Sequence, residues 1–168
     1  MIRTEWFTFA AASRCGCTWF SRLLDELDIE FQGARWHVPG RLDDMPSIAV
    51  RRCPADWLQS CFQNLRSVIG VPAADRFLDL RVNNQTFVEF AELYLAQMPG
   101  AISEMFATYQ PSTYTLDLCN IRHDVVRMFS ELSVPFDPVT VHCFPDKNAS
   151  KRYAHIPDEL RARIVNSA

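Results

Sequence analysis

The sequence of 168 residues lacks several features that mark familiar classes of protein. Its formal net charge is −3, so it has no overall positive field to attract nucleic acid or an anionic lipid surface. No apolar stretch approaches the roughly 20 residues of a membrane-spanning helix, and the first residues carry charges too close together for a secretion signal. We therefore expect a cytoplasmic protein that binds neither nucleic acid nor membrane, and any anion that it binds must meet a local cluster of charge.

Paired cysteine motifs, internal repeats and low-complexity segments are absent as well. The six cysteines form no C-x2-C pairs, and an intracellular chain of this length does not need disulfides, so we expect reduced and mostly buried thiols. Cys15 and Cys17 lie one residue apart with no second pair, which is a poor zinc signature, and we expect no metal site. With 48% hydrophobic residues, the chain is long enough for one core, and we expect a single domain over residues 1–168.

What the sequence does contain is an alternation of short apolar runs and amphipathic stretches. The runs predict strands at residues 6–12, 34–37, 47–52, 112–118 and 138–144. The amphipathic stretches predict helices at residues 18–27, 53–69, 86–97, 101–109, 121–132 and from about 157 onward, while residues 70–85 look irregular. This alternation predicts an α/β fold with a mainly parallel central sheet flanked by helices. Ligands of such folds bind beyond the carboxyl ends of the strands, where Arg14, Arg52 and residues 146–152 would meet.

Residues 13–19, with the sequence SRCGCTW, lie between the first apolar run and the first helix. A loop in this position presents backbone N–H groups and the positive end of the helix dipole, which together bind oxyanions. The loop is of the P-loop nucleotide-binding type, but Gly16 is followed by Cys17 and Thr18 rather than by the lysine that bridges the outer phosphates. The missing lysine argues against the use of a magnesium triphosphate.

The loop resembles the 5'-phosphosulfate loop of the sulfotransferases that use 3'-phosphoadenylyl sulfate (3'-phosphoadenosine 5'-phosphosulfate, PAPS), commonly P-K-[ST]-G-[ST]-[TS]-[WL]. The corresponding positions hold Arg14 for the lysine, Cys15 and Cys17 for two small hydroxyl residues, and an unchanged Gly16, Thr18 and Trp19. The resemblance implies that these six residues contact the cofactor and that Arg14 also acts in catalysis. Trp19 either packs on the adenine or fills the core beneath the helix.

A second segment, Arg52-Cys-Pro-Ala-Asp-Trp-Leu-Gln-Ser60, resembles the family's 3'-phosphate segment, R-[DN]-P-x-D-x-x-x-S. Arg52 stands where a strand ends, and Ser60 lies about two turns into the helix that begins near Pro54, so both can face one phosphate. The resemblance implies that they hold the 3'-phosphate, which excludes ordinary ATP. Without the resemblance, the segment is a strand with a solvent-facing arginine pair followed by a helix that a proline starts.

A third segment concerns the chemistry of the transfer. Arg35-Trp36-His37-Val38-Pro39 resembles the K-x-H-x-P segment of the cytosolic sulfotransferases, whose histidine removes the proton of the acceptor. A histidine pKa of about 6.5 suits that task at neutral pH. The resemblance implies that His37 is the general base, whereas the residues alone also allow a structural histidine at the end of a short strand.

The C-terminal part carries weaker matches. Residues 148–152, with the sequence NASKR, resemble the N-x-S loop of carbohydrate and bacterial sulfotransferases, which closes over the nucleotide. The resemblance implies cofactor contacts from Ser150, Lys151 and Arg152, although the two basic residues fit an exposed helix cap equally well. Asp117 stands near a position that the family often fills with glutamate. Residues 66–100, where acceptor specificity would lie, match no family motif.

The resemblance implies a PAPS-dependent sulfotransferase, which transfers a sulfuryl group to a hydroxyl or amine of a small-molecule or carbohydrate acceptor. The product is 3',5'-diphosphoadenosine, and no metal is needed. Two alternatives stay open: a non-catalytic nucleotide-binding domain, since arginine replaces the family lysine, and a P-loop small-molecule kinase. The chain is shorter than typical members, so the acceptor pocket is either open or completed by a second subunit in a homodimer.

Overall fold

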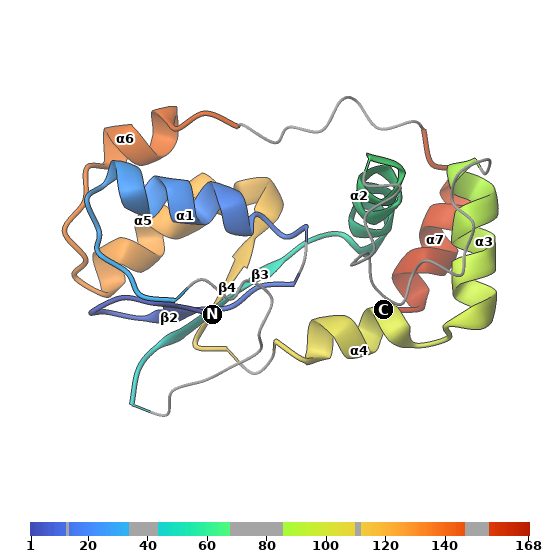
Figure 1. The fold of residues 1–168 in the computed structure, drawn as a ribbon, viewed down its shortest axis with the longest axis horizontal. Helices are drawn as coiled ribbons and strands as arrows, with labels where there is room; N and C mark the ends of the chain where they lie inside the picture. Colours follow the sequence, from blue (N-terminus) through green and yellow to red (C-terminus); the bar gives the residue numbers. More distant parts are fainter. Residues whose placement is uncertain (13, 34–43, 68–85, 110–111, 147–154) are drawn as a thin grey trace. The chain divides into compact units, whose positions relative to one another are not determined.

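A computed structural model describes residues 1–12, 14–33, 44–67, 86–109, 112–146 and 155–168 of the protein. Over these residues the structure is α/β, with a four-stranded, mostly parallel, open sheet and seven α-helices (Figure 1). The strands are β1 (Ile2–Arg3), β2 (Thr8–Phe9), β3 (Ser47–Arg51) and β4 (Tyr114–Asp117). The helices are α1 (Cys17–Glu26), α2 (Pro54–Ser67), α3 (Phe87–Gln97), α4 (Ala101–Ala107), α5 (Ile121–Glu131), α6 (Pro138–Cys143) and α7 (Asp158–Asn166), and a short 3-10 helix, η2 (Leu118–Asn120), precedes α5.

The sheet has the strand order β1-β2-β3-β4, in which β2, β3 and β4 run parallel and β1 pairs antiparallel with β2. The predicted mainly parallel sheet is therefore confirmed. The predicted strand at residues 6–12 is real but short, and the edge strand β1 was not predicted. Two residues are too few for the alternation of apolar and polar side chains that identifies a strand.

The predicted strand at residues 138–144 is wrong, because residues 138–143 form helix α6. The carboxylate of Asp137 accepts hydrogen bonds from the backbone N–H groups of Val139 (3.0 Å) and Thr140 (3.1 Å), which caps the helix. Pro138 occupies the first turn, where a proline favours helix formation. Valine and threonine suggested a strand, but the Asp-Pro start decides the local structure.

By their internal contacts, the residues separate into two compact units. The first comprises Met1–Arg52 and Phe106–Ala149, and the second comprises Cys53–Met105 and Ser150–Ala168. The first unit contains the whole sheet with α1, α5 and α6, and the second contains α2, α3 and α7. The expectation of a single domain stays a prediction.

An aromatic cluster holds the first unit together. Helices α1 and α5 cover the same face of the sheet (Figure 1). Phe20 of α1 stacks on Phe9 of β2 with ring centroids 4.2 Å apart, and Phe129 of α5 stacks on Phe7 at 5.8 Å. All four rings are at most 1% exposed. Each fully buried side chain of this kind contributes about 1.5–3 kcal/mol to the stability of the fold.

The second unit is a helical cluster around Phe62 of α2. The ring of Phe62 lies 5.8 Å from that of Phe87 and 5.1 Å from that of Phe90, both on α3. Helix α3 begins with a capping box, in which Thr86 and Glu89 satisfy each other's backbone N–H groups. The predicted helices of this unit are confirmed within a few residues at their ends.

Two ion pairs connect the helices of the second unit at its surface. Arg161 of α7 donates to Asp56 of α2 at 3.0 Å. Arg163 donates through both terminal nitrogens to Glu92 of α3, at 2.6 and 2.7 Å. The pairs join α7 to both of the other helices, and exposed pairs of this kind contribute little to stability.

Three further expectations concern membranes, thiols and undescribed segments. Among the helices that the structure describes, none combines the length and apolarity that crossing a membrane requires. All six cysteines lie in described segments and are reduced, but Cys119 and Cys143 are exposed, so mostly buried thiols are confirmed only in part. The predicted strand at residues 34–37 and the irregular stretch 70–85 lie outside the described residues.

Candidate anion-binding site at the carboxyl edge of the sheet

The carboxyl ends of β2, β3 and β4 meet at one edge because these strands are parallel. The chain leaves β2 at this edge, forms the loop and enters α1, while β3 ends at Arg51 and is followed by Arg52. The terminal nitrogen Nη1 of Arg52 donates a hydrogen bond to the carbonyl oxygen of Arg14 at 2.7 Å. The predicted meeting of Arg14, Arg52 and residues 146–152 beyond the strand ends is thus confirmed for Arg14 and Arg52 alone, because residues 147–152 lie outside the described residues.

The loop backbone is held in an unusual conformation at two positions. Arg14 has φ 65°, a left-handed conformation that costs a residue with a side chain roughly 1–2 kcal/mol. Gly16, the N-cap residue just before α1, has φ 81°, and an added Cβ would lie 2.9 Å from Cδ1 of Leu118. Backbone strain of this kind is most frequent at functional sites. The strained backbone therefore marks the loop as a candidate ligand-binding segment.

The helix that follows the loop has no side-chain cap at its N-terminus. The first N–H groups of any α-helix lack partners within the helix, and the helix dipole places partial positive charge on them. Thr18 is exposed in this first turn. Because glycine supplies no capping oxygen, an incoming oxyanion can take the place that a serine or aspartate side chain would fill.

The two cysteine thiols of the loop point into the protein. Cys15 is 0% and Cys17 is 7% exposed. The Cys17 thiol donates weak hydrogen bonds to the carbonyl oxygens of Ala11 (3.7 Å) and Ala12 (3.6 Å), and burial raises its pKa to about 11. Both side chains thus support the loop from beneath, and any contact of Cys15 or Cys17 with a ligand would use the backbone N–H groups.

Trp19 belongs to a cluster that joins the start of α1 to the start of α5. Its ring meets the edge of Phe144 at 5.6 Å and lies 5.8 Å from the guanidinium carbon of Arg122. Arg122 in turn donates to the carbonyl oxygen of Phe144 (2.7 Å) and to Asp146 (2.6 Å). The sequence analysis missed Arg122, although its place at the start of a helix behind a strand end is a signal that could have identified it.

The cluster contains two buried N–H groups that find no acceptor among the residues that the structure describes, Nε1 of Trp19 and Nε of Arg122. A buried donor that lacks an acceptor costs about 1–3 kcal/mol. Trp19 is half-buried as a whole, so it is neither a fully buried core residue nor an exposed one. The unused donors give this end of the sheet additional hydrogen-bonding capacity beside the loop.

Arg51, the neighbour of Arg52, has a different role. Its Nη2 lies 3.3 Å from Oδ2 of Asp117 on the adjacent strand, and its side chain is 70% exposed. Asp117 also caps η2 by accepting from the N–H of Cys119 at 2.9 Å. The two consecutive arginines therefore diverge: Arg51 pairs with a carboxylate across the sheet, whereas Arg52 turns to the loop.

Several residues of the predicted site are not placed beside this loop. His37, Ser150, Lys151 and Arg152 lie outside the described residues. Ser60 lies in α2 and is 1% exposed, and it belongs to the second unit whereas Arg52 belongs to the first. The shared grip of Arg52 and Ser60 on one phosphate stays a prediction.

Comparison with models of protein families, with curated protein sequences and with solved structures finds no match to this chain. Its function must therefore be argued from the residues and the geometry of the site.

Proposed function

We propose that the chain binds PAPS at residues 13–19 and transfers its sulfuryl group to a hydroxyl or amine of a small-molecule or carbohydrate acceptor. The observation that carries the proposal is the 2.7 Å hydrogen bond from Arg52 to the carbonyl oxygen of Arg14. It brings the guanidinium of the candidate 3'-phosphate segment into direct contact with the candidate phosphosulfate loop. A cofactor with anionic groups at both its 3' and 5' positions matches two such neighbouring sites.

The 5'-phosphosulfate would bind at the start of α1. The uncapped N–H groups of the first turn and the helix dipole supply positive charge there, and Gly16 supplies no capping side chain that would compete with the ligand. The exposed hydroxyl of Thr18 would donate a further hydrogen bond. Preorganised donors of this kind usually contribute the largest share of catalysis in group transfer.

The 3'-phosphate would bind to Arg52. A guanidinium carries five N–H donors in a fixed plane, and it clamps phosphate oxygens in pairs. The bond to Arg14 uses one N–H and fixes the orientation of the plane at the loop. A nucleotide without a 3'-phosphate would lose this contact, which gives the site its preference for PAPS over ATP.

In the proposed reaction, the acceptor oxygen or nitrogen forms a bond to sulfur while the bond from sulfur to the bridging oxygen of PAPS breaks. The electron pair of that bond leaves with 3',5'-diphosphoadenosine. His37 takes the proton of the acceptor, and Arg14 stabilises the negative charge that develops on the sulfuryl and bridging oxygens. Arginine keeps the charge of the family lysine but transfers a proton less readily, so its role here is electrostatic.

Transfer of labelled sulfate from PAPS to a panel of alcohols, phenols, sugars and amines tests the proposal. We expect turnover with at least one acceptor class, and we expect His37→Ala to remove turnover while 3',5'-diphosphoadenosine still raises the thermal midpoint of the variant. Full turnover by His37→Ala would show that another group is the base. Binding of the nucleotide without transfer to any acceptor would favour the non-catalytic alternative, and a thermal shift with magnesium ATP alone would favour the kinase.

A further inference from the structure

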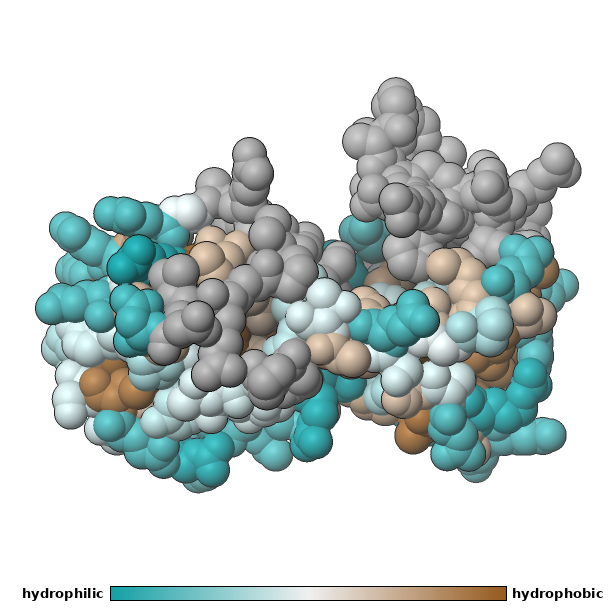
Figure 2. Space-filling model, turned by 90° about the horizontal axis from the view of Figure 1, so that it is seen from below, coloured by the Kyte–Doolittle hydropathy of each residue, from teal (hydrophilic) through white to brown (hydrophobic). Residues whose placement is uncertain are grey.

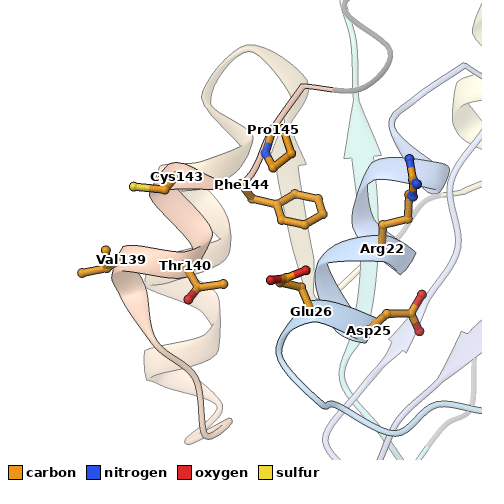
Figure 3. Close-up of a pocket in the computed structure, with 8 residues that line it drawn as sticks. All are labelled: Arg22, Asp25, Glu26, Val139, Thr140, Cys143, Phe144 and Pro145. Atoms are coloured by element: carbon orange, nitrogen blue, oxygen red, sulfur yellow. The ribbon is translucent and has the colours of Figure 1, made fainter.

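A pocket of about 640 Å³ lies between α1 and α6 in the first unit (Figure 3). It is lined by Arg22, Asp25, Glu26, Val139, Thr140, Cys143, Phe144 and Pro145. This volume lies within the range of sites that bind small molecules. None of the lining residues belongs to the candidate nucleotide site, although the ring of Phe144 also touches Trp19. The pocket is therefore separate from the candidate nucleotide site.

The charge of the pocket favours a cation. The lining residues include two carboxylates, Asp25 and Glu26, and one guanidinium, Arg22, so they carry a net charge of −1. Both carboxylates belong to the last turn of α1, where the helix dipole is negative and where α1 has no basic residue. Among the described residues, no cation forms an ion pair with either of them. Negative charge thus stands at an unfavourable position, and no ion pair from the described part of the chain compensates it.

The side chains of the pocket are arranged to hold an ammonium group. Figure 3 shows Glu26 and Thr140 turned toward each other from facing helices, with the ring of Phe144 beside them. A carboxylate attracts a cation by charge, and the face of an aromatic ring attracts it through its quadrupole. Pro145, which lies next to the ring of Phe144 in Figure 3, offers apolar surface to the rest of a ligand.

We propose that this pocket binds a small organic cation, in which an ammonium group is carried on an apolar body. The ammonium lies between the carboxylate of Glu26 and the ring of Phe144, and the apolar body packs along Pro145. The site does not depend on PAPS binding or on sulfuryl transfer. Its test therefore needs neither the nucleotide nor turnover.

Calorimetry with three probes of similar size tests the charge requirement on the full chain. Phenethylammonium is the expected ligand, phenethyl alcohol is its neutral counterpart, and 3-phenylpropionate is an anionic one. We expect binding of phenethylammonium, clearly weaker binding of the alcohol and none of the anion. Equal binding of the ammonium and the alcohol would overturn the proposal, because the carboxylate would then have no role.

Glu26→Gln identifies the carboxylate, with Glu30→Gln as its control. Both glutamates are exposed, so neither substitution should affect folding, but only Glu26 lines the pocket. We expect Glu26→Gln to weaken phenethylammonium binding about three- to fivefold, the effect of one exposed ion pair, and Glu30→Gln to leave it unchanged. Equal effects of the two substitutions would contradict the assignment.

Discussion

Gly16 is constrained by its backbone and by its surroundings. Its φ of 81° disfavours any residue with a side chain, and an added Cβ would approach Leu118 within 2.9 Å. We expect Gly16→Ala to lower the free energy of unfolding by about 1–2 kcal/mol for the backbone, with a smaller addition because the end of the leucine side chain must move.

Gly100→Ala is the matched control for this measurement. Gly100 has a similar φ of 77°, but no atom of the described segments lies within 4 Å of the position of an added Cβ. Urea unfolding of both variants should therefore show the greater loss for Gly16→Ala. A neutral Gly16→Ala would contradict the left-handed conformation of the loop.

The buried thiol of Cys17 should make stability depend on alkaline pH. Burial raises the pKa of this thiol from 9.0 to about 11, so between these values the folded protein binds more protons than the unfolded chain. Stability is therefore fully retained below pH 9 and falls as the pH rises through 11. At pH 10.5 the loss amounts to about 2 kcal/mol.

Urea unfolding at pH 8 and pH 10.5 measures this loss, and substitutions isolate it from other groups that titrate in the same range. Cys17→Ala should remove this part of the pH dependence, whereas Cys143→Ala should retain it because Cys143 is exposed. The same alkaline loss in Cys17→Ala as in the wild type would show that another group is responsible.

At the scale of elements, helix α6 depends on its cap. The Asp137 carboxylate accepts hydrogen bonds from Thr140 and from the N–H of Val139, and these bonds hold its pKa below the usual range. We expect Asp137→Ala to raise hydrogen-exchange rates in α6 roughly fivefold, whereas Asp137→Asn, which also caps helices, should change them little. Equal rates in the two variants would contradict a capping role. The stabilisation of the fold by the Asp137 carboxylate is fully present above the ordinary pKa of an aspartate. It is lost as the pH falls through the lowered pKa that Asp137 has in the folded protein.

The elements that the sequence predicted correctly are those with strong local signals. The helices starting at Pro54 and after Thr86 combine an apolar stripe with a recognisable first turn, and β3 is a continuous apolar run. β1 was missed because its two residues take their structure from pairing with β2. Residues 138–143 were mispredicted because the propensity of valine and threonine was given more weight than the Asp-Pro helix start.

In the candidate site too, the sequence predicted contacts that follow from the order of the strands and missed contacts between side chains far apart in the chain. The meeting of Arg14 and Arg52 followed from the rule that parallel strands end at one edge. The Trp19–Arg122 cluster and the pocket between α1 and α6 bring together side chains from segments far apart in the chain. A local signal existed for Arg122 alone, at the start of a helix behind a strand end, and the contacts themselves are in no local pattern of the sequence.

At the scale of the whole molecule, the two compact units should respond separately to changes in their cores. Phe129 in the first unit and Phe90 in the second are both 0% exposed. A substitution by leucine removes part of a buried ring and should cost about 1–2 kcal/mol, less than the 3–5 kcal/mol of a change to alanine. We expect Phe129→Leu to raise hydrogen exchange in α1 and α5, and Phe90→Leu to raise it in α2 and α3. Uniform changes throughout the chain in both variants would instead indicate one cooperative domain.

The central claim is that Arg52 and the loop at residues 13–19 form a site for a nucleotide with anionic groups at both its 3' and 5' positions. Calorimetry with 3',5'-diphosphoadenosine and with AMP, which lacks the 3'-phosphate, tests this claim most directly. The wild type should bind the diphosphate about 10- to 100-fold more tightly, the effect of a charged hydrogen-bonded contact to the 3'-phosphate. Arg52→Ala should lose this preference while still binding AMP, and Arg51→Ala, whose arginine pairs with Asp117, should keep it. Equal affinity of the wild type for the two nucleotides, or the same effect of both substitutions, would contradict the account.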